Sequence, residues 1–156
     1  MVRHAKAMAS FSLDFERALS EKGKNLCVEL KNFIASKEIG SNNKVFCSSA
    51  KRTKGTYSLI FNRSEEVSFH KSLYLASSND LLAFICSLES KEDIFLIGHN
   101  NGLSDLASYL TGKSVGMKTA ACVEIEFPFE TSKFISKRTG DIRSYHRCDI
   151  GDFHYL

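Results

Sequence analysis

Two arginines and two histidines in this sequence have the chemistry needed to bind and transfer a phosphoryl group. Arg3 and His4 stand side by side at the start, Arg52 lies in "SSAKRT", and His99 lies in "GHNNGL". Arginine guanidinium groups bind phosphate oxygens in pairs. A neutral histidine can attack phosphorus, while a second histidine donates to the developing charge. Since no carboxylate cluster or H-x-x-x-H pattern offers a metal site, these residues predict a metal-independent oxyanion site.

Each of these residues also has an ordinary structural explanation. An Arg-His pair near a terminus can be accidental, a histidine after a strand can be a core residue, and a helical arginine can simply be solvated. The neighbours favour function: Ala5 is small and leaves backbone N–H groups approachable, and residues 98 and 100–102 read Gly and Asn-Asn-Gly. That composition predicts a tight turn whose backbone approaches something closely. Arg52, at the start of a helix, would point toward an anion.

Alternating strand and helix patterns surround these residues. Apolar runs and alternations predict strands at 1–3, 44–47, 67–69, 93–97 and 122–127. Apolar spacing predicts four helices. The first runs from the cap Ser20 to Gly40, the second begins near Ala50, the third follows Asn79 as its cap, and the fourth covers 104–110. Residues 8–19 read as a polar loop, and 133–147 as a hairpin turning at Gly140-Asp141. The order predicts an α/β three-layer sandwich, with a mostly parallel central sheet flanked by helices.

The candidate residues share one position relative to these strands. Arg3 and His4, residues 48–52, and His99 all come directly after a predicted strand. In parallel α/β sheets, active residues gather outside the carboxyl ends of the strands. We therefore expect these residues to meet at one end of the sheet.

Length and composition indicate an ordinary globular protein. The chain has 156 residues, which predicts a single domain at 1–156, with 43% hydrophobic and 25% charged residues. A net charge of +3 does not point to nucleic acid. We find no apolar run long enough to span a bilayer and no leader-like segment before the first motif. Five cysteines without a C-x-x-C pattern predict reduced thiols and a cytoplasmic location, and the absence of a long apolar run predicts no membrane association.

Six segments together resemble one known family. They are "VRHAKA", "DFERALSEKG", "CSSAKRTKGT", "LYLASSNDLL", "LIGHNNGLSDLA" and "KTAACVEIEF", in family order and over nearly the whole chain. The sequence resembles the histidine phosphatase superfamily, also called phosphoglycerate mutase-like, and within it the small SixA-type phosphohistidine phosphatases. Ala5, where mutases typically have glycine, points to the SixA-like branch.

The resemblance implies roles for the four candidate residues. His4 is the nucleophile that forms a phosphohistidine intermediate, Arg3 and Arg52 hold the phosphoryl oxygens, and His99 hydrogen-bonds the transferring group. No cofactor and no metal are implied.

Three further positions are implied as substrate-binding. Arg17 matches an arginine common in the SixA-like branch. It faces the pocket or, as an equal alternative, pairs with Asp14 or Glu16. Thr119 and Ala120 fall where the family usually builds its pocket rim.

The sequence departs from the family pattern in its loops and its first strand. The family's loop prolines are replaced by Ala18, Ser49, Asn101 and Lys118. Each lost proline costs up to about 1 kcal/mol through unfolded-state entropy, so we expect looser loops around an intact site. Only Met1 and Val2 precede the Arg-His pair, so the first strand is truncated or translation starts further upstream.

A carboxylic acid that many relatives carry after the second arginine motif is missing here. Lys71 and Ser72 take its place, and the nearby Glu65, Glu66 and Asp80 are not compelling substitutes. A positioned general acid contributes roughly 10²–10⁴-fold to the rate. Its absence matters most for a basic leaving group such as a sugar alkoxide and least for imidazole, whose conjugate acid has a pKa of about 6.5.

The expected function is therefore hydrolysis of phosphohistidine on a protein, for example a phosphorelay domain. The alternatives are a small-molecule phosphomonoesterase and a phosphate-binding module without turnover. Five basic residues in 133–147 against one acid suggest either a solvated hairpin or a surface for an acidic partner.

Overall fold

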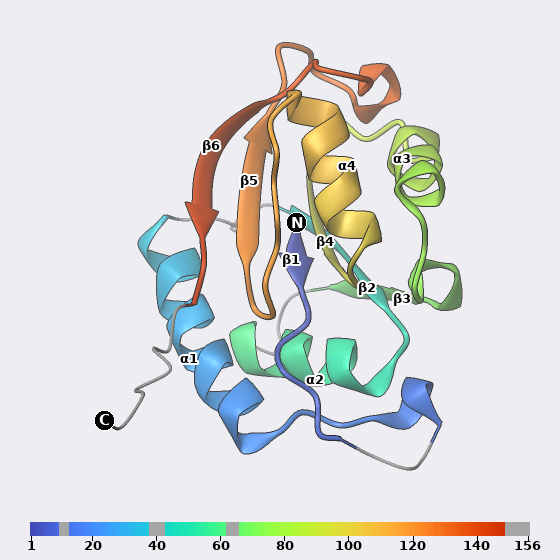
Figure 1. The fold of residues 1–156 in the computed structure, drawn as a ribbon. Coiled ribbons are helices and arrows are strands. Elements are labelled where there is room, and N and C mark those ends of the chain that lie inside the picture. The colour runs from blue at the N-terminus through green and yellow to red at the C-terminus, as the bar shows by residue number, and fades with distance from the viewer. Residues whose placement is uncertain (10–12, 38–42, 62–65, 149–156) are drawn as a thin grey trace.

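The fold is built on one six-stranded sheet. A computed structural model describes residues 1–9, 13–37, 43–61 and 66–148. The strand order is β3-β2-β4-β1-β5-β6 (Figure 1). Four strands pair in parallel with one another, whereas β5 pairs antiparallel with β1 and the edge strand β6 pairs antiparallel with β5, which confirms the predicted mostly parallel sheet. The parallel strands are β1 (Val2–Arg3), β2 (Asn43–Ser48), β3 (Val67–His70) and β4 (Asp93–Gly98), and the antiparallel strands are β5 (Cys122–Glu126) and β6 (Asp141–His146).

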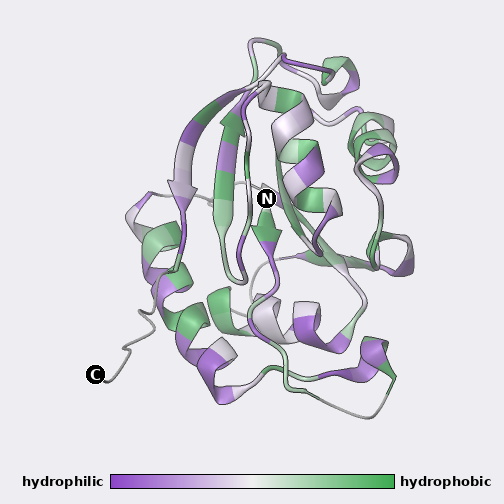
Figure 2. Cartoon of the chain, in the orientation of Figure 1, coloured by the Kyte–Doolittle hydropathy of each residue, from purple (hydrophilic) through white to green (hydrophobic). Residues whose placement is uncertain are grey.

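Two helices cover each face of this sheet. One apolar cluster joins α1 and α2 to one face, and a second joins α3 and α4 to the other. Figure 2 shows hydrophobic and hydrophilic residues alternating along these helices, as expected for elements with one buried face. The predicted three-layer sandwich is therefore confirmed. The helices are α1 (Glu21–Ser36), α2 (Lys51–Ile60), α3 (Ser78–Ser87) and α4 (Gly102–Thr111).

Strand β4 shows why the central strands have continuous apolar runs. Phe95 and Ile97 pack in the cluster beneath α1 and α2, whereas Leu96 packs in the cluster beneath α3 and α4. Side chains alternate between the two faces of a strand, and both faces are covered here. The covered residues of this strand are therefore apolar on both faces, and His99 follows directly after its carboxyl end.

Side-chain caps fix where two helices begin. Ser20 caps α1 as predicted, accepting a hydrogen bond from the Gly23 amide at 3.1 Å. The prediction of Asn79 as the cap of α3 is wrong. The cap is Ser77, which forms a capping box with Asp80, so Asn79 lies inside the helix. The predicted end of the first helix at Gly40 lies outside the described residues.

The predicted hairpin within 133–147 is also wrong. Strand β6 pairs instead with β5, in a register that runs from Cys122 opposite His146 to Glu126 opposite Asp141. The connection includes a 3₁₀ helix at Ser132–Phe134. A Cβ on Gly140 would lie 2.5 Å from a side-chain carbon of Ile125, so this glycine permits close packing against β5.

The segment between β1 and α1 is more ordered than a polar loop. Ala7 and Leu19 form an isolated bridge, and Asp14–Glu16 form a 3₁₀ helix. A Cβ on Gly23 would lie 2.1 Å from the Lys6 carbonyl oxygen, so α1 and this segment are in close backbone contact. In the described ranges, none of the helices is both long and apolar enough to cross a membrane.

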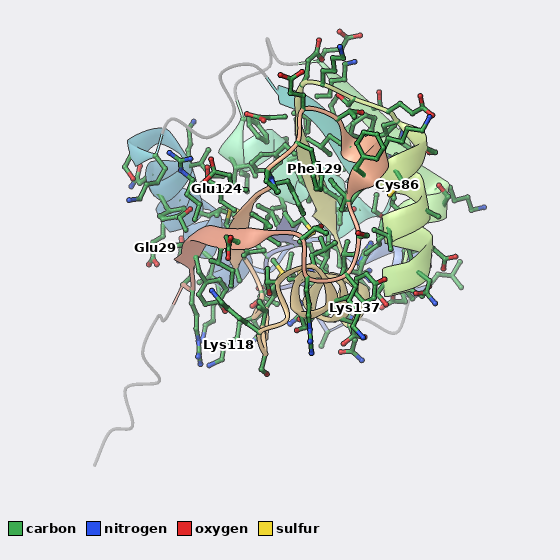
Figure 3. All side chains as sticks on the ribbon, turned by 90° about the horizontal axis from the view of Figure 1, so that it is seen from above. Glu29, Cys86, Lys118, Glu124, Phe129 and Lys137 are labelled. Atoms are coloured by element: carbon green, nitrogen blue, oxygen red, sulfur yellow. The ribbon has the colours of Figure 1, made fainter. Side chains whose placement is uncertain are left out.

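An open cavity of about 750 Å³ lies between β4 and β5, beyond the short strand β1. It is lined by Met1, by 93–96 of β4 and by 122–126 of β5, among others. The α-amino group of Met1 is buried there and donates to the Val123 carbonyl at 2.8 Å, and burial lowers its pKa. Figure 3 views the molecule from this end, with Glu124 and Phe129 labelled. The cavity is at the opposite edge of the sheet from the two histidines.

Candidate active site

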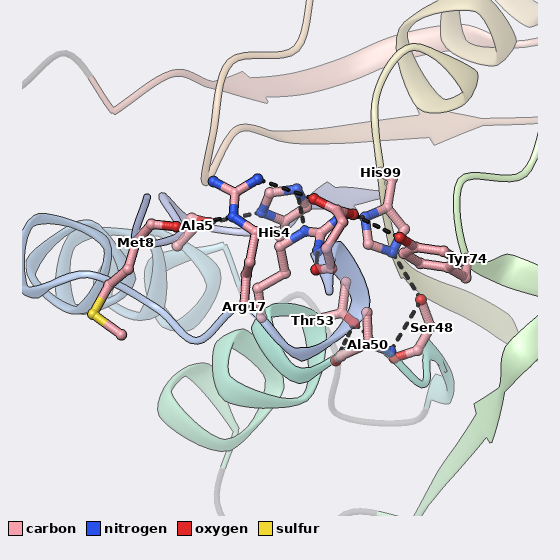
Figure 4. Close-up of polar contacts among 11 residues, drawn as sticks. His4, Ala5, Met8, Arg17, Ser48, Ala50, Thr53, Tyr74 and His99 are labelled. Atoms are coloured by element: carbon pink, nitrogen blue, oxygen red, sulfur yellow. Dashed lines mark hydrogen bonds and ion pairs between the residues drawn. The ribbon is translucent and has the colours of Figure 1, made fainter. Parts of the chain in front are cut away.

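The structure brings the four candidate residues together at the carboxyl ends of β1 and β4. The rings of His4 and His99 are 5.1 Å apart, measured between their centroids. Arg52, in the first turn of α2, lies between them: its Nε is 3.2 Å from His4 Nε2, and its Nη2 is 3.3 Å from His99 Nδ1 (Figure 4). Arg52 is 3% exposed, so the guanidinium is held in a nearly dry site where its donors bind strongly. Arg3 completes the group from the last position of β1.

The hydrogen bonds of His4 fix which of its nitrogens can react. Its Nδ1 is 2.7 Å from the Ala5 carbonyl oxygen, which can only accept. Nδ1 therefore carries the proton, and Nε2 presents a lone pair toward the Nε–H of Arg52. The Nε2 lone pair is thus occupied by the Arg52 donor, and an anion that accepted from Arg52 in its place would leave this nitrogen able to react.

His99 adopts the other neutral tautomer. Its Nδ1 faces Arg52, which has only donors, so Nδ1 accepts. Its Nε2 then carries the proton and donates to the Ser48 hydroxyl at 2.8 Å. Ser48 stands at the end of β2 and thereby sets the orientation of the second histidine.

Burial keeps both histidines neutral. Desolvation, with smaller contributions from neighbouring arginines, lowers the pKa of His4 to about 4. Desolvation and the nearby His4 and Arg52 lower the pKa of His99 to about 3. At neutral pH His4 Nε2 therefore carries no proton. A phosphate dianion between the rings would favour protonated His99, which could then donate from Nδ1 as well.

Arg3 carries a donor that the folded chain leaves unused. Its Nη1 donates to the Met117 carbonyl at 2.9 Å, and that carbonyl also accepts from the Asn100 side chain at 3.0 Å. The Nε of Arg3 is buried and has no hydrogen-bond partner in the described part of the chain. A buried unpaired donor costs about 1–3 kcal/mol. An anion beside Arg3 would remove this cost, so the donor set fits an oxyanion.

Arg52 is also bound by an acid that sequence analysis considered only as a partner of Arg17. Nη1 of Arg52 donates to the Asp14 carbonyl at 2.6 Å, and Nη2 donates to Asp14 Oδ2 at 2.9 Å. The Tyr74 hydroxyl donates to the same Oδ2 at 2.6 Å. The Tyr74 ring packs edge-on against His99, with 5.3 Å between centroids. No local sequence signal joins Asp14, Arg52 and Tyr74, which come from three distant segments.

Of the three positions expected to bind substrate, Arg17 has a side chain that contacts Asp14 of this cluster. Arg17 Nη1 pairs with Asp14 Oδ1 at 3.0 Å and its Nε donates to the Met8 carbonyl at 2.9 Å, so the pairing alternative describes its position. Ala120 is buried in the apolar core, and its amide donates to the His4 carbonyl at 3.2 Å. Thr119 is half-buried beside it. Ala120 therefore supports the end of β1 and offers no amide to a ligand.

The glycine after "HNN" serves packing between backbones. A Cβ on Gly102 would lie 2.0 Å from the Ala76 carbonyl oxygen, so helix α4 starts in close contact with the segment before α3. The close approach predicted for this turn is therefore to another part of the chain.

The basic stretch at 133–147 does not form one surface. Lys133 pairs with Glu89 at 3.1 Å, and Arg143 pairs with Glu126 at 2.9 Å. The Arg138 side chain packs beside Gly112, at the end of α4. Its charges are therefore divided between a loop and an edge strand, and two of them are neutralised.

Comparison with solved structures identifies the fold. A protein from Nakamurella multipartitia described as the phosphohistidine phosphatase SixA matches with a TM-score of 0.79 and 15% identity, over 93% of this chain and 92% of that chain. The protein histidine phosphatase SixA complexed with tungstate matches with a TM-score of 0.74 and 16% identity, over 92% of each chain. An α-ribazole-5′-phosphate phosphatase from Escherichia coli matches with a TM-score of 0.69 and 16% identity, over 94% of each.

The sequence itself gives no such match. No family model matches the chain, and no curated protein sequence is similar to it. The structural likeness shows that the chain has the histidine phosphatase, phosphoglycerate mutase-like fold, as the sequence motifs predicted.

Proposed function

We propose that this protein is a phosphatase that hydrolyses phosphohistidine on another protein through a phosphorylated His4 intermediate. One observation carries the proposal: the unprotonated Nε2 of His4 accepts from Arg52 in a buried site where Arg3 has an unpaired donor. Nucleophile and anion donors thus converge on one point.

In the first step, a phosphoryl oxygen replaces His4 Nε2 as the acceptor of the Arg52 Nε–H. The released lone pair forms the new P–N bond while the P–N bond to the substrate ring breaks, and the breaking electron pair stays on the departing nitrogen. A substrate ring protonated at its other nitrogen leaves as neutral imidazole. Phosphorylated His4 keeps its Nδ1 proton, and the Ala5 carbonyl accepts that proton's hydrogen bond and stabilises the imidazolium.

In the second step, a water oxygen bonds to phosphorus and the P–Nε2 bond breaks. Its electron pair returns to His4, which is again neutral with its proton on Nδ1. Dihydrogen phosphate leaves and loses a proton to solvent. Arg3, Arg52 and His99 stabilise the charge on the transferring oxygens in both steps.

Phosphohistidine is favoured because these residues supply no proton to a leaving group. The pKa of Asp14 is held well below its usual range by Tyr74, Arg17 and Arg52, so the nearby carboxylate is ionised. Asp80, near the position of the expected acid, accepts hydrogen bonds from Ser77 in the capping box. An imidazolium needs no proton from the enzyme, whereas an alkoxide does.

The test measures turnover and the trapped intermediate with a phosphohistidine peptide, an aryl phosphate and phosphoglycerate. We expect the wild type to hydrolyse the peptide and the aryl phosphate at least about 10²-fold faster in kcat/KM than phosphoglycerate, the lower end of what a general acid supplies. His4→Ala should abolish both turnover and labelling. Near-normal activity of His4→Ala would refute the mechanism, and comparable rates on all three substrates would favour a small-molecule phosphomonoesterase.

A further inference from the structure

A single acid lies against the anion-binding arginine of this site. Among the described residues, Asp14 is the only carboxylate that forms an ion pair with Arg52. Arg52 is the residue that also contacts both histidine rings. The Asp14 side chain is 45% exposed and that of Arg52 only 4%, so the carboxylate lies on the solvent side of the guanidinium. A leaving group that departs from phosphorus away from His4 must leave toward that side.

Three donors fix the carboxylate in this place. Arg52 and Tyr74 both donate to its Oδ2, at 2.9 and 2.6 Å, and Arg17 donates to its Oδ1 at 3.0 Å. The tyrosine is itself held by ring contacts with Phe15, at 4.9 Å between centroids, and with His99. Such a carboxylate accepts hydrogen bonds and has no proton to give.

The positive charge of the pocket would repel a cationic leaving group unless a negative charge stood nearby. Arg3, Arg17 and Arg52 attract the phosphoryl group but repel any positive charge attached to it. A phosphoramidate is hydrolysed through a form whose nitrogen leaving group is protonated, so its substrate combines an anionic phosphoryl group with a cationic leaving group. A negative charge on the solvent side of Arg52 offsets that repulsion.

We propose that Asp14 is a specificity-determining residue: its carboxylate, fixed by Tyr74 and Arg17, selects phosphoramidates with a cationic leaving group over phosphate esters. The proposal rests on the proposed function and names the substrate class of the same site. Asp14 stabilises the cationic leaving group, which is protonated at the leaving nitrogen of an amine or at the other nitrogen of an imidazole, so that the group departs as a neutral amine or imidazole. Toward an ester, whose leaving oxygen becomes negative, the same carboxylate is repulsive, and it competes with the phosphoryl oxygens for Arg52.

The test compares kcat/KM for N-phosphoimidazole and 4-nitrophenyl phosphate in Asp14→Asn and the wild type. An opposite charge within about 4–6 Å shifts a pKa by 1–3 units, so we expect a loss of at least about 10-fold with N-phosphoimidazole. The ester should be hydrolysed equally fast or faster. Tyr74→Phe should change the ratio in the same direction by a smaller factor. Glu16→Gln removes an exposed acid from the same 3₁₀ helix and should leave the ratio unchanged.

Equal losses on both substrates in Asp14→Asn would overturn the proposal, because they would show that Asp14 only positions Arg52. Turnover by the wild type and its loss in His4→Ala would still support the phosphatase function in that case. If the wild type hydrolyses neither compound, the phosphatase function fails and this proposal fails with it. Thermal unfolding of each variant checks folding, and Tyr74→Phe tests the proposal if Asp14→Asn is unfolded.

Discussion

Binding of a tetrahedral oxyanion should stabilise the folded protein through Arg3. At a concentration of 100 times Kd, a ligand that binds only the folded state stabilises it by about 2.7 kcal/mol. For a domain of this size, each kcal/mol raises the melting temperature by about 2–4 °C, so we expect a saturable increase of about 5–11 °C with tungstate or phosphate. The buried Nε of Arg3 would gain its acceptor in this complex.

The stability of Arg3→Met relative to the wild type should depend on whether an anion is bound. Without an anion, the variant loses the hydrogen bond to the Met117 carbonyl, worth about 1 kcal/mol, but also loses a buried unpaired donor that costs about 1–3 kcal/mol. Arg3→Met should therefore be as stable as the wild type, or more stable, in chloride. In saturating tungstate it should be less stable, since only the wild type binds the anion fully.

The assay is thermal unfolding at pH 7.5 with increasing tungstate, and with sodium chloride at matched ionic strength as the control. A general salt effect would not saturate and would be the same in both proteins. An increase in melting temperature of equal size in Arg3→Met and the wild type would refute the assignment of the unpaired Nε of Arg3 to an anion site. So would the absence of any saturable shift in the wild type.

Four further predictions concern pH, the second histidine and packing. The free energy of unfolding should fall as the pH drops from 6.5 toward 4. In that range His4 and His99 bind protons in the unfolded chain, whereas the buried rings of the folded protein, with pKa values of about 4 and about 3, do not. Urea unfolding at pH 7.5 and 4.5 measures this difference, and greater stability at pH 4.5 would contradict it. Ser48→Ala leaves the His99 Nε2 proton without its acceptor and should cost about 1–3 kcal/mol in the same assay. Gly23→Ala should destabilise the folded protein despite a helix propensity gain of about 1 kcal/mol, because the new Cβ would meet the Lys6 carbonyl. The control Gly116→Ala, whose new Cβ would meet nothing within 4 Å, should leave the stability nearly unchanged. Four apolar residues joined to the amino group of Met1 should extend β1 into the cavity between β4 and β5 and raise the melting temperature; an unchanged value would show that the cavity does not accept a strand.

The position of the four central residues could be predicted because local and topological rules agree. Each lies at the end of a strand or shortly after one, and parallel strands place their carboxyl ends at one edge of the sheet. Arg3, His4 and His99 therefore converge once β1 and β4 pair, and Arg52 joins them because β2 lies beside β4. No long-range side-chain information was needed.

The pairing of β6 could not be read in the same way. Its partner, β5, is separated from it by the segment 127–140, and Gly140-Asp141 resembles a local turn. The close packing of Gly140 against Ile125 is a property of the assembled sheet. Turn composition alone does not distinguish these two uses of a glycine.

The acid beside Arg52 could not be predicted from the sequence, and it changes one conclusion about the leaving group. The family pattern predicts an acid next to Ser72, and its absence from the sequence indicates that leaving groups depart without a proton from the enzyme. The structure places an acid at the site after all, supplied by Asp14 of the 3₁₀ helix Asp14–Glu16 and held by Tyr74. Tyr74 and two arginines lower the pKa of this carboxylate, so it is a charge and not a proton donor. The preference for leaving groups that need no proton therefore still holds, and the carboxylate adds to it, because a fixed negative charge favours a leaving group that is already protonated.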